Sequence, residues 1–467
     1  MKKKLSVFIS ALLVICTVFS IAILPANAAN YKNKVKVASK SALLVDLETG
    51  QTVYEKGADK KRYPASTTKI MTYIIVAENV NNFKRAEVLV KQAVLDKLNG
   101  TGSSMANVGS HVGKKMSVLD LLYSMMVPSG NDAAMVLADY IGGNTLASKG
   151  KSRDNIDSNI RQFVSMMNAK AKKLGCKDTH FMNPDGLHDE KHYTTARDLS
   201  KMALYALDLP EFSKITNTTT YFIQGEDYPL ITTNYLIDAN RGGNYYYQYA
   251  QGIKTGTTDE AGHCLVTVGK ADGNSYLGVF LKSPYNPDPT KDVYGTMIDA
   301  KELFRWSLTQ LALNQVASAE TPMREVKLNL AWGKNSVQLV PEKNINAIVP
   351  KSYKDSDIKI ETKAPEEGID APVKKGDVVG KAVVYYDGEE VDKKTKLAEV
   401  NLVSSETVER SEILFYWSVI TKFVSSIWFK IVLGVIVFLL IIYIIISTMA
   451  KRRSRKRRRN IRRYRNF

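Results

Sequence analysis

Cysteine is scarce in this sequence, and its scarcity excludes one class of fold. The chain has 467 residues and three cysteines, of which Cys16 lies in an N-terminal apolar run. The other two, Cys176 and Cys264, are too few to form the disulfide framework of a small secreted domain. Cys264 lies in an apolar run typical of a strand, so we expect a buried free thiol there. The sequence leaves open whether it pairs with Cys176.

Acidic residues are missing from the C-terminal tail, and this explains most of the net charge. The chain carries a net charge of +18, and residues 451–467 supply 11 lysines or arginines and no acid. Lys2, Lys3 and Lys4 supply three more positive charges, which leaves only +4 for the rest of the chain. Each charged end adjoins an apolar run. This pattern indicates membrane topology and argues against nucleic-acid binding.

Charged residues are also absent from two long apolar runs. Residues 5–24 follow the basic start and precede an Ala-x-Ala site, which predicts a signal peptide at residues 1–28 that is cleaved after Ala28. An uncleaved signal anchor is the alternative, because the run is long. Residues 431–449 are uncharged and, at about 1.5 Å per residue, can cross a bilayer core as a helix. The basic tail at 451–467 is then expected in the cytoplasm, in contact with anionic lipids.

Between these runs the sequence predicts two globular domains. Apolar residues make up 45% of the chain and charged residues 24%, which are ordinary proportions. Residues 29–318 are expected to form the larger domain. Residues 319–408 are rich in Lys, Glu and Val in short alternating runs, which predicts a small β-rich domain. Residues 409–450 are expected to hold an amphipathic segment followed by the transmembrane helix.

Periodicity in the larger domain predicts strands at both ends and helices in the middle. This order favours an α/β fold, with an antiparallel sheet closed by distant segments and sandwiched by helices. The expected elements are a hairpin at 41–56, a buried helix from Pro64 through Val76, helical residues 117–141 interrupted at 128–130, helices at 156–174 and 195–207 (the latter capped by Thr194), strands at 252–258, 262–270 and 276–283, and a helix at 295–313.

The first of three candidate catalytic motifs is Ser66 followed three residues later by Lys69. Pro64 predicts a helix start, because the first turn leaves unpaired the N–H that proline lacks. Residues at i and i+3 share a helix face, so the Lys69 amine can reach the Ser66 hydroxyl. Lysine can act as the general base that activates the serine if burial, or the charge of Lys254, lowers its pKa. The motif alone also fits a surface serine and lysine on a helix.

The second motif, Ser129-Gly130-Asn131, follows an apolar run that ends at Pro128. Residues two apart in an extended loop share a side, so Ser129 and Asn131 are expected to face the site together. We expect Ser129 to relay a proton between Lys69 and the leaving amine, and Asn131 to hydrogen-bond the substrate amide. The alternative is a plain turn between helices, which these residue types favour.

The third motif lies on a predicted strand and consists of Lys254, Thr255, Gly256 and Thr257. Gly256 permits close approach of another backbone, and a peptide substrate could add to this strand. Lys254 is expected to supply positive charge, while the hydroxyls of Thr255 and Thr257 bind a substrate carboxylate. The backbone N–H groups of Ser66 and Thr257 would form the oxyanion hole. The alternative is an ordinary exposed strand with a lysine.

The three motifs together are more specific than any one of them. They follow one another at separations of 63 and 125 residues, and the set is shared by penicillin-binding proteins and serine β-lactamases. Residues 35–315 resemble more closely the low-molecular-mass penicillin-binding proteins, the D-alanyl-D-alanine carboxypeptidases of peptidase family S11. Residues 179–187, similar to the family segment H-F-x-N-P-x-G-L, and residues 192–198, similar to H-Y-S-T-A-R-D, extend the resemblance.

The resemblance implies a fold, a reaction and a set of partners. The fold is that of the serine β-lactamases and D,D-peptidases, to which the family adds a small C-terminal β domain and a membrane anchor. In the implied reaction Ser66 attacks the D-Ala–D-Ala bond of a peptidoglycan stem peptide, the terminal D-Ala leaves, and water releases the shortened peptide. β-Lactam antibiotics are expected to acylate the same serine. No cofactor or metal is expected, because His188 and His192 lack the H-E-x-x-H order and lie in a predicted loop.

Two positions depart from what many relatives carry. Thr257 stands where many have His or Asn, and residues 293–297 lack an arginine that many use to bind the substrate carboxylate. Carboxylate binding is therefore expected to depend more on Thr255, Thr257 and Lys254.

Two other functions are weighed against the peptidase. A β-lactamase needs fast deacylation, usually from an added carboxylate base, and no acidic residue is clearly placed for that role. A non-catalytic cell-wall-binding scaffold is expected to have lost Ser66, Lys69 or Lys254, and all three are present. The sequence leaves open the balance of carboxypeptidase, endopeptidase and transpeptidase activity.

Overall fold

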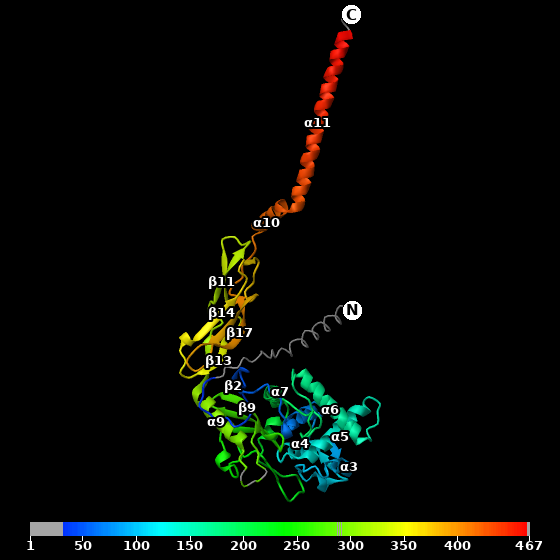
Figure 1. Cartoon of the computed structure of the whole chain (residues 1–467), viewed down its shortest axis with the longest axis vertical. Helices are drawn as coiled ribbons and strands as arrows, with labels where there is room; N and C mark the ends of the chain where they lie inside the picture. The colour runs from blue at the N-terminus through cyan, green and yellow to red at the C-terminus, as the bar shows by residue number, and fades with distance from the viewer. Residues whose placement is uncertain (1–30, 287, 289, 291, 465–467) are drawn as a thin grey trace. The chain divides into compact units, whose positions relative to one another are not determined.

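The computed structural model describes residues 31–464 except residues 287, 289 and 291 (Figure 1). The predicted signal peptide lies outside the described residues. The chain divides into two compact units. The first holds the chain up to Ala317 together with Ile345–Ile360 and Val383–Ala398. The second holds Ser318–Asn344, Glu361–Ala382 and the chain from Glu399 onward.

A five-stranded antiparallel sheet forms the centre of the first unit. Strands from the start of the chain pair with strands from much later, as predicted, so the sheet is closed by distant segments. Asp272 and Gly273 form the last tight turn, with φ values of 49° and 81°, a geometry suited to a two-residue hairpin. In the order β2-β1-β9-β8-β7, the strands are β2 (Thr52–Lys56), β1 (Ser41–Asp46), β9 (Asn274–Ser283), β8 (Gly262–Ala271) and β7 (Ala250–Thr258).

Helices cover both faces of this sheet. Side chains of a strand alternate between faces, and β1 shows this directly. Leu43 and Val45 belong to the core shared with the central helices, whereas Ala42 and Leu44 belong to the core under α9 (Gly295–Gln310). The predicted α/β sandwich is therefore confirmed.

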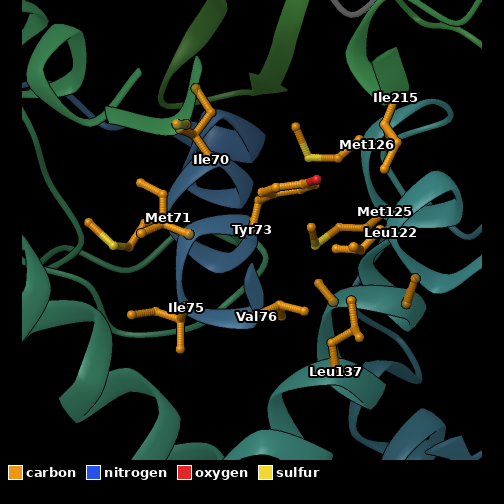
Figure 2. Packing of buried hydrophobic residues seen from close by; sticks show 14 of the residues in the cluster. Ile70, Met71, Tyr73, Ile75, Val76, Leu122, Met125, Met126, Leu137 and Ile215 are labelled. Carbon is orange, nitrogen blue, oxygen red and sulfur yellow. The ribbon is translucent and has the colours of Figure 1, made fainter. Parts of the chain in front are cut away.

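The helix that carries the first motif is buried on nearly all sides. A 3-10 turn, η1 (Ala65–Thr68), leads into α2 (Lys69–Asn79). The apolar side chains from Ile70 to Val76 are at most 3% exposed. In Figure 2, Tyr73 and Val76 point toward α4, whereas Met71 points away from it into another part of the core. Such burial contributes about 1.5–3 kcal/mol for each large apolar side chain, so the core fixes this helix firmly.

The remaining elements of the first unit are mostly helical. The predicted interruption at 128–130 is confirmed, since one helix ends before it and the next begins after it. These remaining helices and strands are β3 (Glu87–Leu89), α3 (Gln92–Leu95), η2 (Asp96–Leu98), η3 (Val108–His111), β4 (Lys115–Ser117), α4 (Val118–Met126), α5 (Asn131–Ala147), α6 (Ile156–Lys173), α7 (Ala196–Leu207), α8 (Phe212–Thr216), β5 (Thr220–Tyr221), β6 (Leu230–Ile231) and η4 (Gly243–Tyr245).

Three predicted helix boundaries are wrong, one of them because α5 continues to Ala147, six residues beyond the predicted end at 141. The N-cap of α7 is Thr195, whose hydroxyl accepts the Asp198 N–H at 3.0 Å, because the Thr194 hydroxyl is paired with that of Thr179. The predicted helix 295–313 ends at Gln310. The next residues form β10 (Leu311–Ala317), which pairs with β13 (Ile345–Pro350) and so satisfies its backbone in a second sheet.

The predicted small β domain is confirmed, although not all of its chain belongs to the second unit. Its six-stranded sheet has the order β14-β16-β17-β12-β11-β15. In the first unit, the Gln51 side chain binds both backbone groups of Ile348 on β13 at 2.9 Å, and the Tyr31 hydroxyl donates to the same carbonyl at 2.7 Å. The elements are β11 (Arg324–Asn329), β12 (Ser336–Pro341), η5 (Asp355–Asp357), β14 (Ile358–Lys363), β15 (Ile369–Asp370), β16 (Val378–Tyr386) and β17 (Thr395–Ser404).

The described chain ends in two helices with exposed apolar surfaces. α10 (Glu412–Ser425) begins at the cap residue Ser411 and exposes aromatic side chains such as Trp417 and Phe423. α11 (Ile427–Tyr464) follows, and its segment Ile427–Arg455 is long and apolar enough to cross a membrane. None of the most apolar window of that segment is buried against the protein, unlike the core helix α2.

Candidate active site

Ser66 lies in the first turn of η1, in backbone that the surrounding structure holds in an uncommon shape. Ala65, just before it, has a φ of 47°, which few residues with a side chain adopt. Such conformations cluster at functional sites because neighbouring structure must enforce them. The Thr67 N–H and hydroxyl both donate to the Pro64 carbonyl, at 3.2 and 2.7 Å, and close the turn. Ser66 itself is only half-buried and remains accessible.

The Lys69 amine is fully buried and makes three hydrogen bonds. It donates to the Ser66 hydroxyl at 2.8 Å, to the Asn131 side-chain oxygen at 2.6 Å and to the Asp185 carbonyl at 2.8 Å. Burial lowers the pKa of Lys69 to about 8, against the opposing influence of the Asp185 and Asp132 charges. Roughly a tenth of Lys69 is therefore neutral at pH 7, against far less for an ordinary lysine, and the neutral form is the one that can take a proton from Ser66.

Lys254 brings a second buried amine to the site from β7. It is 2% exposed and donates to the Thr255 carbonyl at 3.0 Å. Burial, and then the charge of Lys69, hold the pKa of Lys254 well below its ordinary value. The two amines repel one another, so protonating one makes it harder to protonate the other.

The second motif forms the loop between α4 and α5. Ser129 is buried with a φ of 68°, and the Gly130 N–H donates to the Ser124 carbonyl at 3.0 Å. A Cβ on Gly130 would lie 2.5 Å from that of Ala106, so glycine is required there. Asn131 begins α5 with both ends of its carboxamide engaged. The loop therefore fixes the Lys69 amine through the Asn131 side chain.

Asn131 and Asp132 tie this loop to a second one at residues 103–108. The Asn131 amide donates to the Ser103 hydroxyl at 3.2 Å. The buried Asp132 carboxylate accepts backbone N–H groups from Ala106 and Val108 at 3.0 Å. A carboxylate with this many backbone donors stabilises the loop strongly. Sequence reasoning missed Asp132, although an acid in a mostly apolar helix directly after the motif was an available signal.

Two glycines lie against the backbone of the nucleophile. A Cβ on Gly256 of β7 would lie 2.8 Å from the Ser66 nitrogen, which confirms the predicted close approach of another backbone at this glycine. A Cβ on Gly186 would lie 2.9 Å from the same nitrogen and 2.0 Å from the Ala65 carbonyl oxygen. Gly186 also has a φ of 91°. The Ser66 nitrogen is thus enclosed between a strand and a loop, neither of which can carry a side chain at that point.

The loop that carries Gly186 is hydrogen-bonded to α2, the helix that begins at Lys69. The Thr72 hydroxyl donates to the Pro184 carbonyl at 2.5 Å, and the Gly186 N–H donates to the Asn183 side chain at 2.8 Å. Asp185 is fully buried, and burial raises the pKa of its carboxyl despite the nearby Lys69. The predicted site did not include this loop, although its sequence carries part of the family resemblance.

His192 is a neutral support for η1. The Met182 N–H donates to Nδ1 of His192 at 3.3 Å, so the ring proton is on Nε2, which donates to the Thr68 hydroxyl at 2.9 Å. Burial lowers the pKa of His192 to about 4, so the ring stays neutral at neutral pH.

Thr255 and Thr257 follow Lys254 on β7, which is the edge strand of the five-stranded sheet. The Thr255 hydroxyl is 2.5 Å from that of Thr233, and the exposed Thr257 hydroxyl is 3.0 Å from Nδ1 of His263. An edge strand presents backbone groups to which an extended peptide can add. All three motifs therefore meet around Ser66 and Lys69, beside an available strand edge.

This geometry agrees with the family to which the chain is similar. Residues 27–284 match the model of the peptidase S11 family, D-alanyl-D-alanine carboxypeptidase. The chain belongs to this family. Residues 314–410 match the C-terminal domain of penicillin-binding protein 5. The predicted family and the predicted enzyme class are confirmed.

Relatives in sequence and structure support this assignment. A Bacillus subtilis D-alanyl-D-alanine carboxypeptidase, DacF, is 29% identical over 75% of this chain and 82% of its own length. A Streptomyces D-alanyl-D-alanine carboxypeptidase is 32% identical over 58% of this chain and 89% of its own. The structure of penicillin binding protein 5 from Haemophilus influenzae aligns with a TM-score of 0.63 at 25% identity, covering 81% of this chain and 100% of that one.

Both cysteines among the described residues of this S11 peptidase, Cys176 and Cys264, are free thiols. Cys264 is buried and donates weakly to the Tyr63 carbonyl at 3.6 Å, while Cys176 donates to the Asp198 carbonyl at 3.4 Å. Burial raises the pKa of Cys264 to about 11 and that of Cys176 to about 12. The predicted buried free thiol at Cys264 is confirmed, and neither cysteine presents a reactive thiolate at neutral pH.

Proposed function

We propose that the protein removes the terminal D-alanine from peptidoglycan stem peptides that end in D-Ala-D-Ala, with Ser66 as the nucleophile. The observation that carries this proposal is the 2.8 Å contact between the buried Lys69 amine and the Ser66 hydroxyl. A serine hydroxyl needs an adjacent base to attack a carbonyl carbon. Lys69 meets that need because burial lowers its pKa to about 8.

Acylation begins when neutral Lys69 takes the Ser66 proton as the oxygen attacks the carbonyl carbon between the two D-alanines. The backbone N–H groups of Ser66 and Thr257 stabilise the resulting oxyanion. Ser129 relays the proton to the nitrogen of the departing D-alanine. Asn131 fixes Lys69 and contacts the substrate amide. The C–N bond then breaks and leaves the shortened peptide as an ester on Ser66.

The third motif holds the substrate during this step. The peptide adds along the edge of β7, where its backbone pairs with the strand. Lys254, Thr255 and Thr257 bind the terminal carboxylate, with Gly256 allowing the strand to lie against η1. In deacylation, water attacks the ester carbonyl, its proton passes to the site base, and the Ser66 hydroxyl is restored. A penicillin reacts in the same way: the Ser66 oxygen attacks the carbonyl carbon of the β-lactam ring, the lactam C–N bond breaks, and an ester forms on Ser66.

We further propose that the catalytic domain acts outside the membrane that anchors it. The chain is expected to be exported through residues 1–28 and cleaved after Ala28. α11 then crosses the bilayer, and the arginine-rich end stays in the cytoplasm with anionic lipids. The apolar surface of α10 lies at the outer interface, where its exposed aromatic side chains favour the headgroup region.

The proposal is tested with full-length protein in detergent, measuring D-Ala release from a pentapeptide mimic and labelling by fluorescent penicillin. Ser66→Ala is expected to lose both activities. Ser165→Ala, at an exposed position on α6, is the matched control and should retain both. If Ser66→Ala retained either activity, Ser66 would not be the nucleophile.

The lifetime of the penicilloyl enzyme separates this peptidase from a β-lactamase. The carboxylate of Asp132 is occupied by backbone donors, and that of Asp185 is buried and accepts the Leu187 N–H at 3.1 Å. Neither resembles an exposed carboxylate holding a hydrolytic water. We therefore expect the acyl-enzyme to persist for minutes or longer after free penicillin is removed, whereas rapid turnover would favour the β-lactamase. A scaffold protein would show no acylation at all.

A further inference from the structure

A histidine and an aspartate stand directly behind Thr257. His263 on β8 is the cross-strand partner of Thr257 on β7, and its Nδ1 is 3.0 Å from the threonine hydroxyl oxygen. Its other ring nitrogen, Nε2, is 2.9 and 2.8 Å from the two carboxylate oxygens of Asp292. The three side chains form one continuous chain of hydrogen bonds that ends at the hydroxyl of Thr257, which is an exposed residue of β7.

This arrangement is buried and held in place from several sides. His263 is 3% exposed, and the Asp292 side chain is 9% exposed. Asp292 also accepts the Asn286 N–H at 3.0 Å, which fixes the carboxylate. The rings of Tyr285 and Tyr294 pack against the imidazole at 5.3 and 4.8 Å between centroids.

Among the described residues, Asp292 is the only carboxylate in contact with the His263 ring. The other titratable groups that face the imidazole are the phenols of Tyr285 and Tyr294. Burial raises the pKa of Tyr294, so this phenol remains neutral near neutral pH. Among the described residues in contact with the ring, no cation opposes the charge of Asp292.

The proton positions follow from the partners. A carboxylate only accepts hydrogen bonds, so Nε2 of His263 carries a proton in either charge state. If the ring is neutral, Nδ1 accepts a hydrogen bond from the Thr257 hydroxyl, which leaves oxygen lone pairs facing the substrate. If the ring is an imidazolium, Nδ1–H donates to the hydroxyl oxygen, and the hydroxyl proton is free for another acceptor.

A substrate carboxylate interacts more favourably with the Thr257 hydroxyl in one of these two states than in the other. It is repelled by the lone pairs of a hydroxyl that donates elsewhere, and it accepts a hydrogen bond from a hydroxyl whose proton is free. The negative Asp292 stabilises the imidazolium, which is the state that frees this proton. Asp292 comes from the segment just before α9, close to the stretch 293–297 that lacks the arginine used by many relatives.

We propose that His263 and Asp292 are positioning residues that make the Thr257 hydroxyl a hydrogen-bond donor to the terminal carboxylate of the substrate. This inference rests on the proposed carboxypeptidase function. It makes binding of the carboxylate depend on a proton held by His263.

Steady-state kinetics on two matched peptides test the inference, one ending in D-Ala-D-Ala with a free carboxylate and one with a terminal carboxamide. For the free acid, His263→Gln and Asp292→Asn are expected to raise KM about tenfold while kcat stays within about twofold. For the carboxamide, both variants should match the wild type. His180→Gln is the matched control and should leave both peptides unaffected, because the half-buried His180 ring contacts the Lys191 carbonyl and is no part of the hydrogen bonds to Thr257. Equal losses on both peptides would show a merely structural role and overturn the inference.

Proton magnetic resonance of the His263 ring gives a readout that needs no turnover. The probe is the dipeptide D-alanyl-D-alanine, added to full-length protein in detergent, and His263→Gln assigns the ring signal. Bound dipeptide is expected to move the midpoint of the His263 titration to higher pH by about one unit, since a tenfold affinity difference between the two ring states requires that shift. The shift should vanish in Thr257→Val.

The two readouts separate the inference from the proposed function. If wild-type protein neither releases D-Ala nor reacts with penicillin, the proposed function fails. The titration of the His263 ring with and without dipeptide still tests the inference in that case. An unchanged midpoint in saturating dipeptide overturns the inference even in a fully active enzyme.

Discussion

Lys69 and Lys254 are two amines buried within one site, and their burial opposes folding. The folded protein holds the pKa of Lys69 at about 8, below its ordinary value of 10.5. Stability is therefore reduced by roughly 3 kcal/mol at neutral pH, and this loss is recovered only as pH rises from about 8 toward 10.5. A protein that keeps such a group uses it chemically, as expected for a general base.

The pH dependence of acylation follows from the same pKa. Below pH 8 each unit of acidification should lower the rate of acylation by a penicillin about tenfold, because protonated Lys69 cannot accept the Ser66 proton. Above that pH the rate should level off. Stopped-flow measurement of penicillin binding across the range checks this.

Lys69→Arg provides the matched comparison, since arginine keeps the positive charge but stays protonated at every accessible pH. We expect a much slower reaction in this variant, without an inflection near pH 8. A wild-type rate that is flat from about pH 6 to pH 9 would contradict the role of Lys69 as the base.

At the residue scale, the sequence predicted the members of the site better than their partners. Ser66 and Lys69 are three apart on a helix, so local geometry alone brings them together. Asp132, Asp185 and His263 act through contacts with segments far along the chain. No spacing rule reports such contacts, and these residues were therefore missed.

At the scale of elements, the site depends on how closely η1, β7 and the loop at residues 183–187 approach one another. The approach is so close at Gly186 and Gly256 that an added Cβ would meet the backbone around Ser66 within 3 Å. Neither segment can carry a side chain at this point without displacing the nucleophile.

Substituting Gly186 by alanine should therefore disrupt acylation. The new Cβ would lie 2.0 Å from the Ala65 carbonyl oxygen, and its φ of 91° is unfavourable for alanine. We expect at least a hundredfold slower reaction with penicillin and a lower melting temperature, measured by fluorescent labelling and thermal unfolding.

Gly273→Ala separates backbone strain from collision. Gly273 also has a positive φ, of 81°, but nothing lies within 4 Å of a Cβ built there. This variant should lose only about 1 kcal/mol and react with penicillin normally. Equal behaviour of the two variants would show that the contact at Gly186 has no special importance.

Most elements followed from the periodicity of the sequence, and the errors arose where tertiary pairing overrides it. The pattern of residues 295–313 is helical throughout, yet Leu311 begins β10 because Pro350 on β13, 39 residues further along the chain, offers it a partner. The cap of α7 shifts by one residue because Thr179 engages the Thr194 hydroxyl. Partners of this kind cannot be read from a local window.

At the scale of the whole molecule, catalysis and membrane attachment belong to separate parts of the chain. The site lies wholly in the first unit, and the candidate membrane span lies in the second. The second unit begins at Ser318. The return of two later segments to the first unit was not predicted, because their alternating patterns are the same as those of their neighbours.

Ending the chain after Arg410 should release an active enzyme from the membrane. The shortened protein is expected to stay in the aqueous phase without detergent and to react with penicillin at the full-length rate, because every residue of the site belongs to the first unit. Cell fractionation and labelling measure both properties. Removing only residues 451–467 is the control and should leave the protein in the membrane, since α11 retains its apolar segment. An inactive shortened protein would show that the anchor supports catalysis.

The Ser66 nitrogen enclosed between Gly186 and Gly256 bears on the evolution of drug resistance. An enzyme escapes an inhibitor by changing residues that contact the drug but not the natural substrate. The two positions beside the Ser66 nitrogen accept only glycine. Any larger residue there displaces the backbone of Ser66, which the reactions with penicillin and with peptide both require. Resistant variants should therefore arise at positions that meet the drug's side chain or its carboxylate, and the surroundings of the serine should stay unchanged under selection.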